Sequence, residues 1–302
     1  MQELLDSKLQ EFGGEADAYR KKSEDMRRLT VLEKKHKNEE LFTKDDLIFL
    51  YEINGKIEGF GYEKDPRIYE LRKGRNPEED MLVIFECSRE QIAYSDSQIN
   101  GNTRVYVGKL KKGIFQKLPE SLQYIYTSFP SSRIEKVKVE VGGKSANELI
   151  SELEQVGVSL SDEVKNKIKN IGFIEKKEMT FIRLTVRDFG LNGDPITKHI
   201  CACAEVFGLA LCWAGIVPYY RLKYLDQPIG EDLLVVMKPG LNPPGSFPTF
   251  GLSNERGARY DEEKDEYYDC MTMNFGSSSS HQYLERNEKL LFILPNSSSS
   301  QL

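Results

Sequence analysis

The hydrophobic positions near the N-terminus recur at helical spacing. An apolar stripe runs through this highly charged segment and consists of Tyr19, Met26, Leu29 and Leu32. Such a narrow stripe is typical of a helix that packs on one side only. Thr43 precedes the polar triplet Lys-Asp-Asp, so its hydroxyl is expected to cap a second helix that ends near Gly55. Residues 1–76 are therefore predicted to form a helical region.

The pattern changes near residue 80, where short apolar runs begin. Four of them are predicted strands: MLVIFEC at 81–87, then 104–110, 122–129 and 133–141. The last run alternates between apolar and charged positions, which indicates a strand with one exposed face in an antiparallel sheet. Ser145 and Glu148 form a capping-box pattern before an apolar helix, and Ser161 is expected to cap the next one. Residues 77–175 are thus predicted to be a β-rich segment with a capped helix pair.

The last block mixes long apolar runs of both types. We predict strands at residues 178–190, 219–225, 233–238 and 290–294, and a helix at 197–211. The run LLVVMK (233–238) is apolar on both faces, so it is expected at the centre of a sheet. Residues 176–295 are predicted to be an α+β C-terminal domain with a mostly antiparallel sheet, followed by a flexible tail at 296–302. The fold class expected for the whole chain is α+β.

Composition narrows the classes of function. The chain has 302 residues, 39% hydrophobic and 30% charged, with a formal net charge of −6. This indicates a folded protein without the basic excess that nucleic-acid-binding domains usually carry. The longest apolar run, VFGLALCWAGIVP, is too short to cross a bilayer, and the N-terminal sequence lacks the pattern of a signal peptide. The odd number of cysteines fits a reducing compartment. We therefore expect a cytoplasmic protein that makes no membrane contact.

Three of the five cysteines cluster around residue 200, in HICACAEVFGLALCW. His199 and Cys203 are four residues apart and share a helix face, as the first two ligands of a zinc site would. Cys212 beside His281 could instead form a nucleophile and base. The surrounding residues are mostly apolar, and a cysteine without a bonded partner behaves there as a small hydrophobic side chain. We favour the packing role and expect neither a metal nor a cofactor.

Candidate binding residues lie further along the same block. Arg221 and Lys223 are expected on one side of a strand, and Lys238 at the end of another, so adjacent strands would bring cations together at a site for an anion. Residues 239–248 are rich in proline and glycine and are expected to form a loop beside aromatic residues. Tyrosine and arginine are frequent at the centres of interfaces. The predicted binding residues are Arg221, Tyr224, Lys238 and Phe247.

Four longer stretches carry a resemblance. They are DDLIFLYEINGKIEGFGYEKDPRI, YIYTSFPSSRIEKVKVEVGGKSANELISELE, FIRLTVRDFG and LALCWAGIVPYYRLKYLDQPIGEDLLVVMKP. Together they are similar to a group of hypothetical proteins of candidate-phyla bacteria. Cys212 matches a cysteine in the pattern of that group, whereas Cys201 and Cys203 stand where it has ordinary helix residues, and Trp213 where proline is expected. The resemblance implies no activity, cofactor or partner.

The functional hypothesis follows from what the sequence carries. It contains no nucleotide-binding P-loop, no G-x-S-x-G and no H-E-x-x-H pattern. We expect a non-enzymatic module that binds a protein partner or acts as a scaffold. One alternative is a hydrolase that uses Cys212 or a carboxylate cluster. Another is weak nucleic-acid binding through the basic helix at residues 20–28 and 34–37, although a nucleic-acid partner is not favoured.

Overall fold

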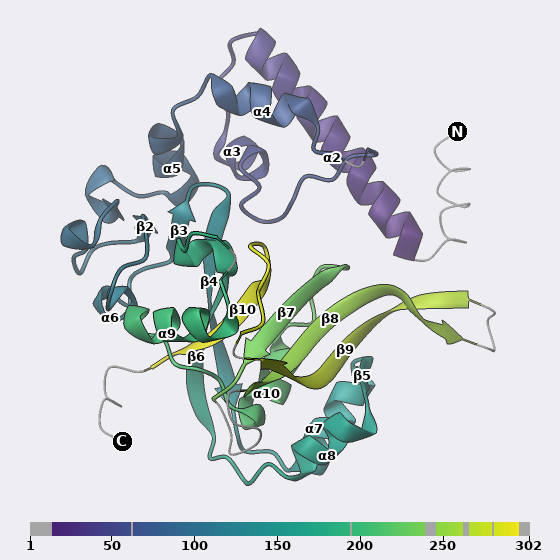
Figure 1. Ribbon diagram of the computed structural model, residues 1–302. Coiled ribbons are helices and arrows are strands. Elements are labelled where there is room, and N and C mark those ends of the chain that lie inside the picture. Colours follow the sequence, from purple (N-terminus) through teal and green to yellow (C-terminus); the bar gives the residue numbers. More distant parts are fainter. Residues whose placement is uncertain are drawn as a thin grey trace. The chain divides into compact units, whose positions relative to one another are not determined.

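The computed structural model describes residues 14–61, 63–193, 195–238, 246–261, 266–279 and 281–295. The chain divides into two units, Met1–Ile92 and Ala93–Leu302 (Figure 1). The fold is α+β, as expected, with helices and one large sheet. In the described part of the chain, no helix is both long and apolar enough to cross a membrane.

The first unit is built from helices. They are α2 (Gly14–Lys37), α3 (Lys44–Leu50), α4 (Pro66–Lys73), α5 (Pro77–Phe85) and the short η1 (Arg89–Gln91). The Thr43 hydroxyl accepts from the Asp46 amide and the Asp46 carboxylate accepts from the Thr43 amide, so the predicted cap of α3 is confirmed. The core of this unit consists of Leu29, Leu32, Phe49, Leu50, Ile57, Ile68 and Leu71.

The strand predicted at residues 81–87 is wrong, because MLVIFEC belongs mostly to α5. Asn76 caps this helix and Pro77 occupies its first turn, where proline is well tolerated. Met81, Ile84 and Phe85 are buried at helical spacing. A short apolar run fits a buried strand or a buried helix equally well. Here Asn76 and Pro77, a few residues before the run, favour the helix.

The second unit contains most of the sheet. The strands are β1 (Ile92–Ala93), β2 (Val105–Val107), β3 (Tyr124–Ser128), β4 (Ser132–Val141), β5 (Val158–Leu160), β6 (Lys177–Thr185), β7 (Glu231–Val236), β8 (Ser246–Asp261), β9 (Glu266–Ser279) and β10 (Lys289–Leu294). They lie in the order β1-β2-β3-β4-β6-β10-β7-β8-β9-β5. The sheet is mixed, because β2 pairs with β3, β5 with β9 and β7 with β10 in parallel. The pairings β3–β4, β4–β6, β6–β10, β7–β8 and β8–β9 are antiparallel.

Helices cover both faces of this sheet. The helices α7 (Ala146–Gln155), α8 (Asp162–Lys169) and α10 (Val217–Lys223) contribute to one hydrophobic core, together with Phe181 and Leu291 of the central strands. On the other face, α6 (Ile114–Lys117) and α9 (Thr197–Phe207) pack against Ile182 and Phe292 (Figure 1). Three further short helices, η2 (Asp96–Gln98), η3 (Val186–Phe189) and η4 (Ala214–Ile216), complete the unit.

Several predicted elements are confirmed in this unit. Ser145 and Glu148 form the expected capping box of α7, and the Ser161 hydroxyl accepts from the Val164 amide at the start of α8. The run at 233–238 provides β7, which lies between β10 and β8 and is therefore central. The final strand also forms as expected.

Other predicted elements are shorter or of another type. The strand predicted at 178–190 ends at Thr185 and continues as η3, and the helix predicted at 197–211 ends at Phe207 because Gly208 takes a left-handed conformation. The strand predicted at 219–225 is wrong, since these residues belong to α10 and its C-terminal end, with Pro218 in the first turn. Residues 246–248 of the expected loop belong to β8, whereas residues 239–245 and the tail at 296–302 lie outside the described residues.

The expected boundaries at residues 76 and 175 do not coincide with the two units. The first unit extends to Ile92. β4 and β6 lie on opposite sides of residue 175, yet they pair along seven residues from Glu135↔Arg183 to Val141↔Lys177. This antiparallel ladder places Glu135 directly opposite Arg183, a pair that proves central to the site described next.

Candidate functional site

The structure brings together two of the four predicted binding residues. Arg221 lies in α10 and Tyr224 caps its C-terminal end, with the Arg221 guanidinium 5.6 Å from the centre of the Tyr224 ring. Phe247 instead belongs to the core on the α9 side of the sheet. Lys238 is exposed, and its backbone amide donates to the Cys212 carbonyl at 3.3 Å. Arg221 and Tyr224 therefore lie together in a region that contains both charged side chains and aromatic rings.

Arg183 is the central side chain of this region. It projects from β6 toward α10 and is only 8% exposed. Its guanidinium lies 3.9 Å from the centre of the Tyr224 ring, a cation–π contact. Its Nη2 donates to Glu135, the residue opposite it on β4. Arg183 is thus held between the neighbouring strand and the end of α10.

Glu231, at the start of β7, connects the surrounding side chains. One carboxylate oxygen accepts from the Tyr224 hydroxyl and the other pairs with Lys289 of β10. Arg183 Nη1 lies 3.9 Å from the first oxygen. Burial and the hydrogen bond to Glu231 raise the pKa of Tyr224, so this ring is an uncharged donor at neutral pH.

Arg221 is buried behind this layer and has no carboxylate partner in the described part of the chain. It is fully buried, and its Nη1 donates to the Gln227 side-chain carbonyl. The Gln227 amide nitrogen in turn donates to the backbone oxygens of Glu231 at 2.8 Å and Leu252 at 2.7 Å. Burial lowers the pKa of Arg221 to about 10, because desolvation penalises the charged form.

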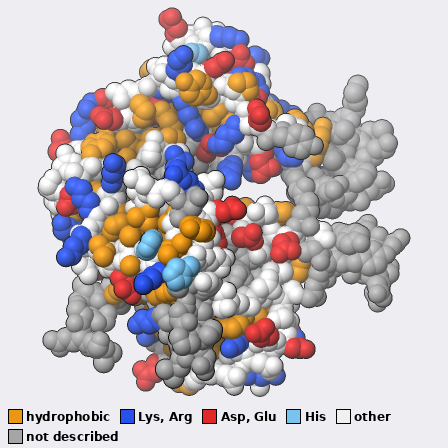
Figure 2. Space-filling view, in the orientation of Figure 1, with side chains coloured by type: hydrophobic (Ala, Val, Ile, Leu, Met, Phe, Trp, Pro, Cys, Tyr) orange, Lys and Arg blue, Asp and Glu red, His pale blue; other side chains and the backbone are white. Residues whose placement is uncertain are grey.

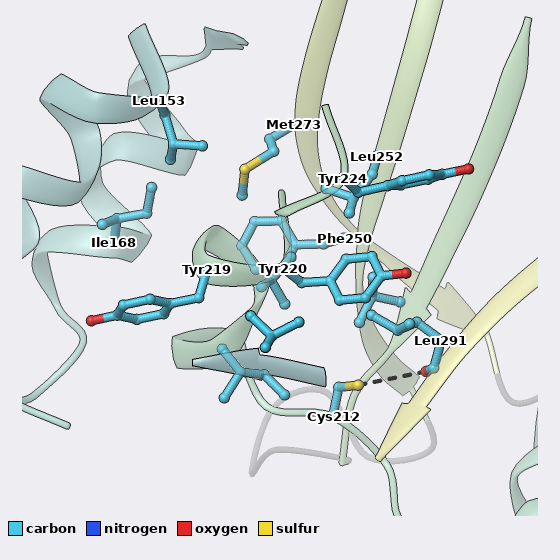
Figure 3. Close-up of a cluster of buried hydrophobic side chains, with 14 of the residues drawn as sticks. Leu153, Ile168, Cys212, Tyr219, Tyr220, Tyr224, Phe250, Leu252, Met273 and Leu291 are labelled. Atoms are coloured by element: carbon cyan, nitrogen blue, oxygen red, sulfur yellow. Dashed lines mark hydrogen bonds between the residues drawn. The ribbon is translucent and has the colours of Figure 1, made fainter. Parts of the chain in front are cut away.

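A cavity of about 370 Å³ opens beside Arg183 and the end of α10. We call it the arginine pocket, and its lining residues are Glu135, Val137, Arg183, Tyr220, Lys223, Tyr224, Leu225 and Asp226. Arg183, Tyr220 and Tyr224 are buried and form its inner part, whereas Lys223, Leu225 and Asp226 are exposed at its rim. Figure 3 shows that Tyr220 and Tyr224 project from α10 to the same side, away from Tyr219.

Polar atoms in the inner part of the pocket lack partners. Within the described residues, Arg183 Nε, Arg183 Nη1 and the Tyr220 hydroxyl accept or donate no hydrogen bond, and neither does Arg221 Nε behind them. A buried polar group left without a hydrogen bond costs about 1–3 kcal/mol. Most buried polar groups in folded proteins have partners. Arg183 and Tyr220 therefore have buried hydrogen-bonding atoms without partners in the wall of the cavity, closed off from solvent.

The cysteines around residue 200 divide between core and surface. Cys201 and Cys212 are buried, as the packing hypothesis expects, and the Cys212 thiol donates to the Leu291 carbonyl at 3.5 Å (Figure 3). Burial raises the pKa of both thiols, that of Cys201 to about 12. Cys203 is only partly buried, and burial raises the pKa of its thiol as well.

A second hollow lies along α9. His199 and Cys203 share a helix face there, as their spacing predicts, and line a groove of about 690 Å³ together with Leu191, Asn192, Gly193, Pro195, Ala202 and Tyr283. In Figure 2, hydrophobic side chains and histidine gather over α9. Among the described residues, no group of three or more His, Cys, Asp or Glu side chains is arranged to hold a metal ion.

The basic helix considered for nucleic-acid binding is α2. Several of its cations are paired with carboxylates: Lys21 with Asp25 and Glu58, Lys35 with Asp46, and Lys37 with Glu33. Such pairs reduce the charge available to phosphates.

The predicted binding residues did not include Arg183, Glu135, Tyr220 or Glu231. The run FIRLT carries one useful sign, since Arg183 stands between two apolar residues in a strand that is otherwise suited to burial. A charged residue at such a position needs partners from other segments. Those partners come from β4, β7 and α10, which the local pattern does not connect to β6.

Comparisons with protein-family models, curated proteins and solved structures gave no match.

Proposed function

We propose that this protein is a non-enzymatic binding module that holds its ligand through a carboxylate group in the arginine pocket. The observation that carries the proposal is the buried Arg183, which lines a cavity and has two nitrogens without hydrogen-bond partners in the described part of the chain. Arginine is the side chain best suited to recognise carboxylates. The Tyr220 hydroxyl, also unpartnered there, offers a further donor.

The setting of the cysteines supports binding rather than thiol chemistry. A nucleophilic cysteine needs an accessible thiolate next to a base. The Cys212 side chain is fully buried, donates to a backbone carbonyl, and has a raised pKa because of burial. The carboxylates nearest the pocket, Glu135 and Glu231, are engaged by Arg183, Tyr224 and Lys289. These contacts support the binding role over the hydrolase alternative.

The size of the pocket favours a small ligand group over a broad protein surface. Specific protein interfaces bury about 800 Å² on each partner, whereas a cavity of about 370 Å³ lies near the lower end of the range for small-molecule sites, roughly 300–1,000 Å³. The protein partner expected from the sequence stays compatible with this site if it presents one carboxylate to Arg183.

Saturation-transfer NMR on the full chain tests this function with three carboxylate probes: L-leucine, N-acetyl-L-leucine and glutarate. We expect at least one probe to bind and Arg183→Gln to abolish its signal. Arg187→Gln is the matched control, because Arg187 is exposed on η3 and does not line the pocket. This control should bind like the unaltered protein.

A second variant keeps the test valid if Arg183→Gln impairs folding, which circular dichroism would show. Lys223 lies at the exposed rim, so Lys223→Gln should leave the fold intact and weaken the probe up to about fivefold, as expected for an exposed charge pair. The proposal is overturned if no carboxylate binds to the folded protein. It is also overturned if both Arg183→Gln and Lys223→Gln bind the probe as tightly as the unaltered protein does.

A further inference from the structure

The arginine pocket carries charges of both signs in equal number. Its cations are Arg183 and Lys223, and its anions are Glu135 and Asp226. Lys223 and Asp226 are exposed at the rim and form no ion pair within the described residues. A ligand that bears one positive and one negative group would match this pattern.

We propose that the ligand of the arginine pocket is a free zwitterionic α-amino acid, an inference that rests on the carboxylate-binding function proposed above. The α-carboxylate lies toward Arg183 and Lys223, where the unpartnered nitrogens of Arg183 lack an acceptor. The α-ammonium lies toward Asp226, which forms no ion pair within the described residues, and toward Glu135, whose carboxylate it shares with Arg183.

Ligands of one sign fit this pocket less well. A phosphate or a dicarboxylate would place additional negative charge beside Glu135 and Asp226, and like charges held close together cost binding free energy. A simple amine would place additional positive charge beside Arg183 and Lys223, which also costs binding free energy. The equal numbers of positive and negative side chains therefore weaken the binding of ligands that carry only one sign of charge.

The remaining walls indicate the kind of side chain. Val137 and Leu225 are apolar, and Tyr220 and Tyr224 present their rings. These surfaces suit an apolar side chain of modest size, for which leucine is a fitting probe. The C-terminus of a protein partner has no α-ammonium and its N-terminus has no carboxylate, so a chain end would satisfy only half of the pocket.

Isothermal titration calorimetry with three probes separates these cases. L-leucine has both charges, N-acetyl-L-leucine has only the carboxylate, and L-leucinamide has only the ammonium. We expect each single-charge probe to bind at least about tenfold more weakly than L-leucine, because each loses a charge-assisted set of contacts.

Asp226→Asn tests the ammonium side of the pocket. It should weaken L-leucine about threefold or more and leave N-acetyl-L-leucine unchanged. Asp232→Asn is the control, because Asp232 is an exposed aspartate on β7 that does not line the pocket, and it should change neither affinity.

The outcomes distinguish the two proposals. If N-acetyl-L-leucine binds as tightly as L-leucine and Arg183→Gln abolishes both, carboxylate binding stands and the zwitterion is overturned. If L-leucinamide binds as tightly as L-leucine, or if none of the three binds, the zwitterion is overturned. The carboxylate-binding function fails with it when glutarate does not bind either.

Discussion

At the scale of single residues, burial separates the cysteines by reactivity. Attack on a maleimide requires the thiolate, and the pKa of Cys201 is raised to about 12 by burial. Its thiolate fraction at neutral pH is therefore roughly a thousandfold below that of an ordinary thiol. Cys212 is shielded even more completely, whereas Cys203 is partly exposed on the α9 groove.

We predict that maleimide labelling of the folded protein, followed by intact mass spectrometry, modifies Cys203 long before Cys201 or Cys212. Cys203→Ser should remove one rapidly labelled equivalent, whereas Cys212→Ser should remove none. Rapid loss of the Cys212 thiol at neutral pH would contradict its role as a packing residue and would favour the hydrolase alternative.

At the scale of elements, the turn from β4 into α7 depends on one glycine. Gly142 has φ +91, and a methyl group there would lie 2.3 Å from the Glu175 carbonyl oxygen and 2.6 Å from the Ile174 carbonyl oxygen. Both contacts are with backbone, which cannot move aside without disturbing the start of β6. Gly157 after α7 also has a positive φ, +81, but a methyl group there would contact nothing within 4 Å.

The two glycines therefore form a matched pair of substitutions. Gly157→Ala should cost about 1–2 kcal/mol in free energy of unfolding, the cost of a left-handed conformation alone. Gly142→Ala adds a steric clash and should cost clearly more, about 3 kcal/mol or above. Urea denaturation followed by circular dichroism measures both, and equal costs would show that the turn relaxes around the added methyl group.

Local pattern sufficed where caps and alternation were clear, as at Thr43, Ser145, Ser161 and the last strand. It failed for α5 and α10, because a short apolar run buries equally well in either conformation and only Pro77 and Pro218 indicated the helix. Only part of the candidate site could be predicted from the sequence. Arg221 and Tyr224 are neighbours in sequence, whereas Arg183 meets Glu135 and Glu231 through strand pairing that joins distant segments.

At the scale of the whole molecule, buried tyrosines make stability depend on alkaline pH. Burial raises the pKa of Tyr126 to about 12 and also raises the pKa of Tyr51, Tyr220 and Tyr224. In the unfolded chain these hydroxyls ionise near their ordinary pKa of about 10. Between that pH and the raised pKa, the folded state binds more protons than the unfolded state, so stability falls as pH rises.

Two groups change stability in the opposite direction: Lys136, whose pKa burial also lowers, and Arg221. The folded pKa of Arg221, about 10, lies below the unfolded value, so the unfolded state binds more protons above pH 10 and this residue alone would make stability rise there. Each tyrosine subtracts up to about 1.4 kcal/mol per pH unit over its window, and four of them outweigh one arginine and one lysine. The midpoint of urea denaturation should thus be nearly constant from pH 7 to about 9 and fall steeply above about 10.

Tyr220→Phe provides the specific check, because phenylalanine keeps the ring and removes the ionising hydroxyl. This variant should lose stability less steeply above about pH 10, and removing an unpartnered hydroxyl should leave its stability at neutral pH unchanged or slightly higher. The near-ultraviolet absorbance of tyrosinate should rise together with unfolding rather than before it. If that absorbance instead titrated fully near pH 10 while the fold persisted, the buried tyrosine hydroxyls would be open to water, and the predicted loss of stability at alkaline pH would be contradicted.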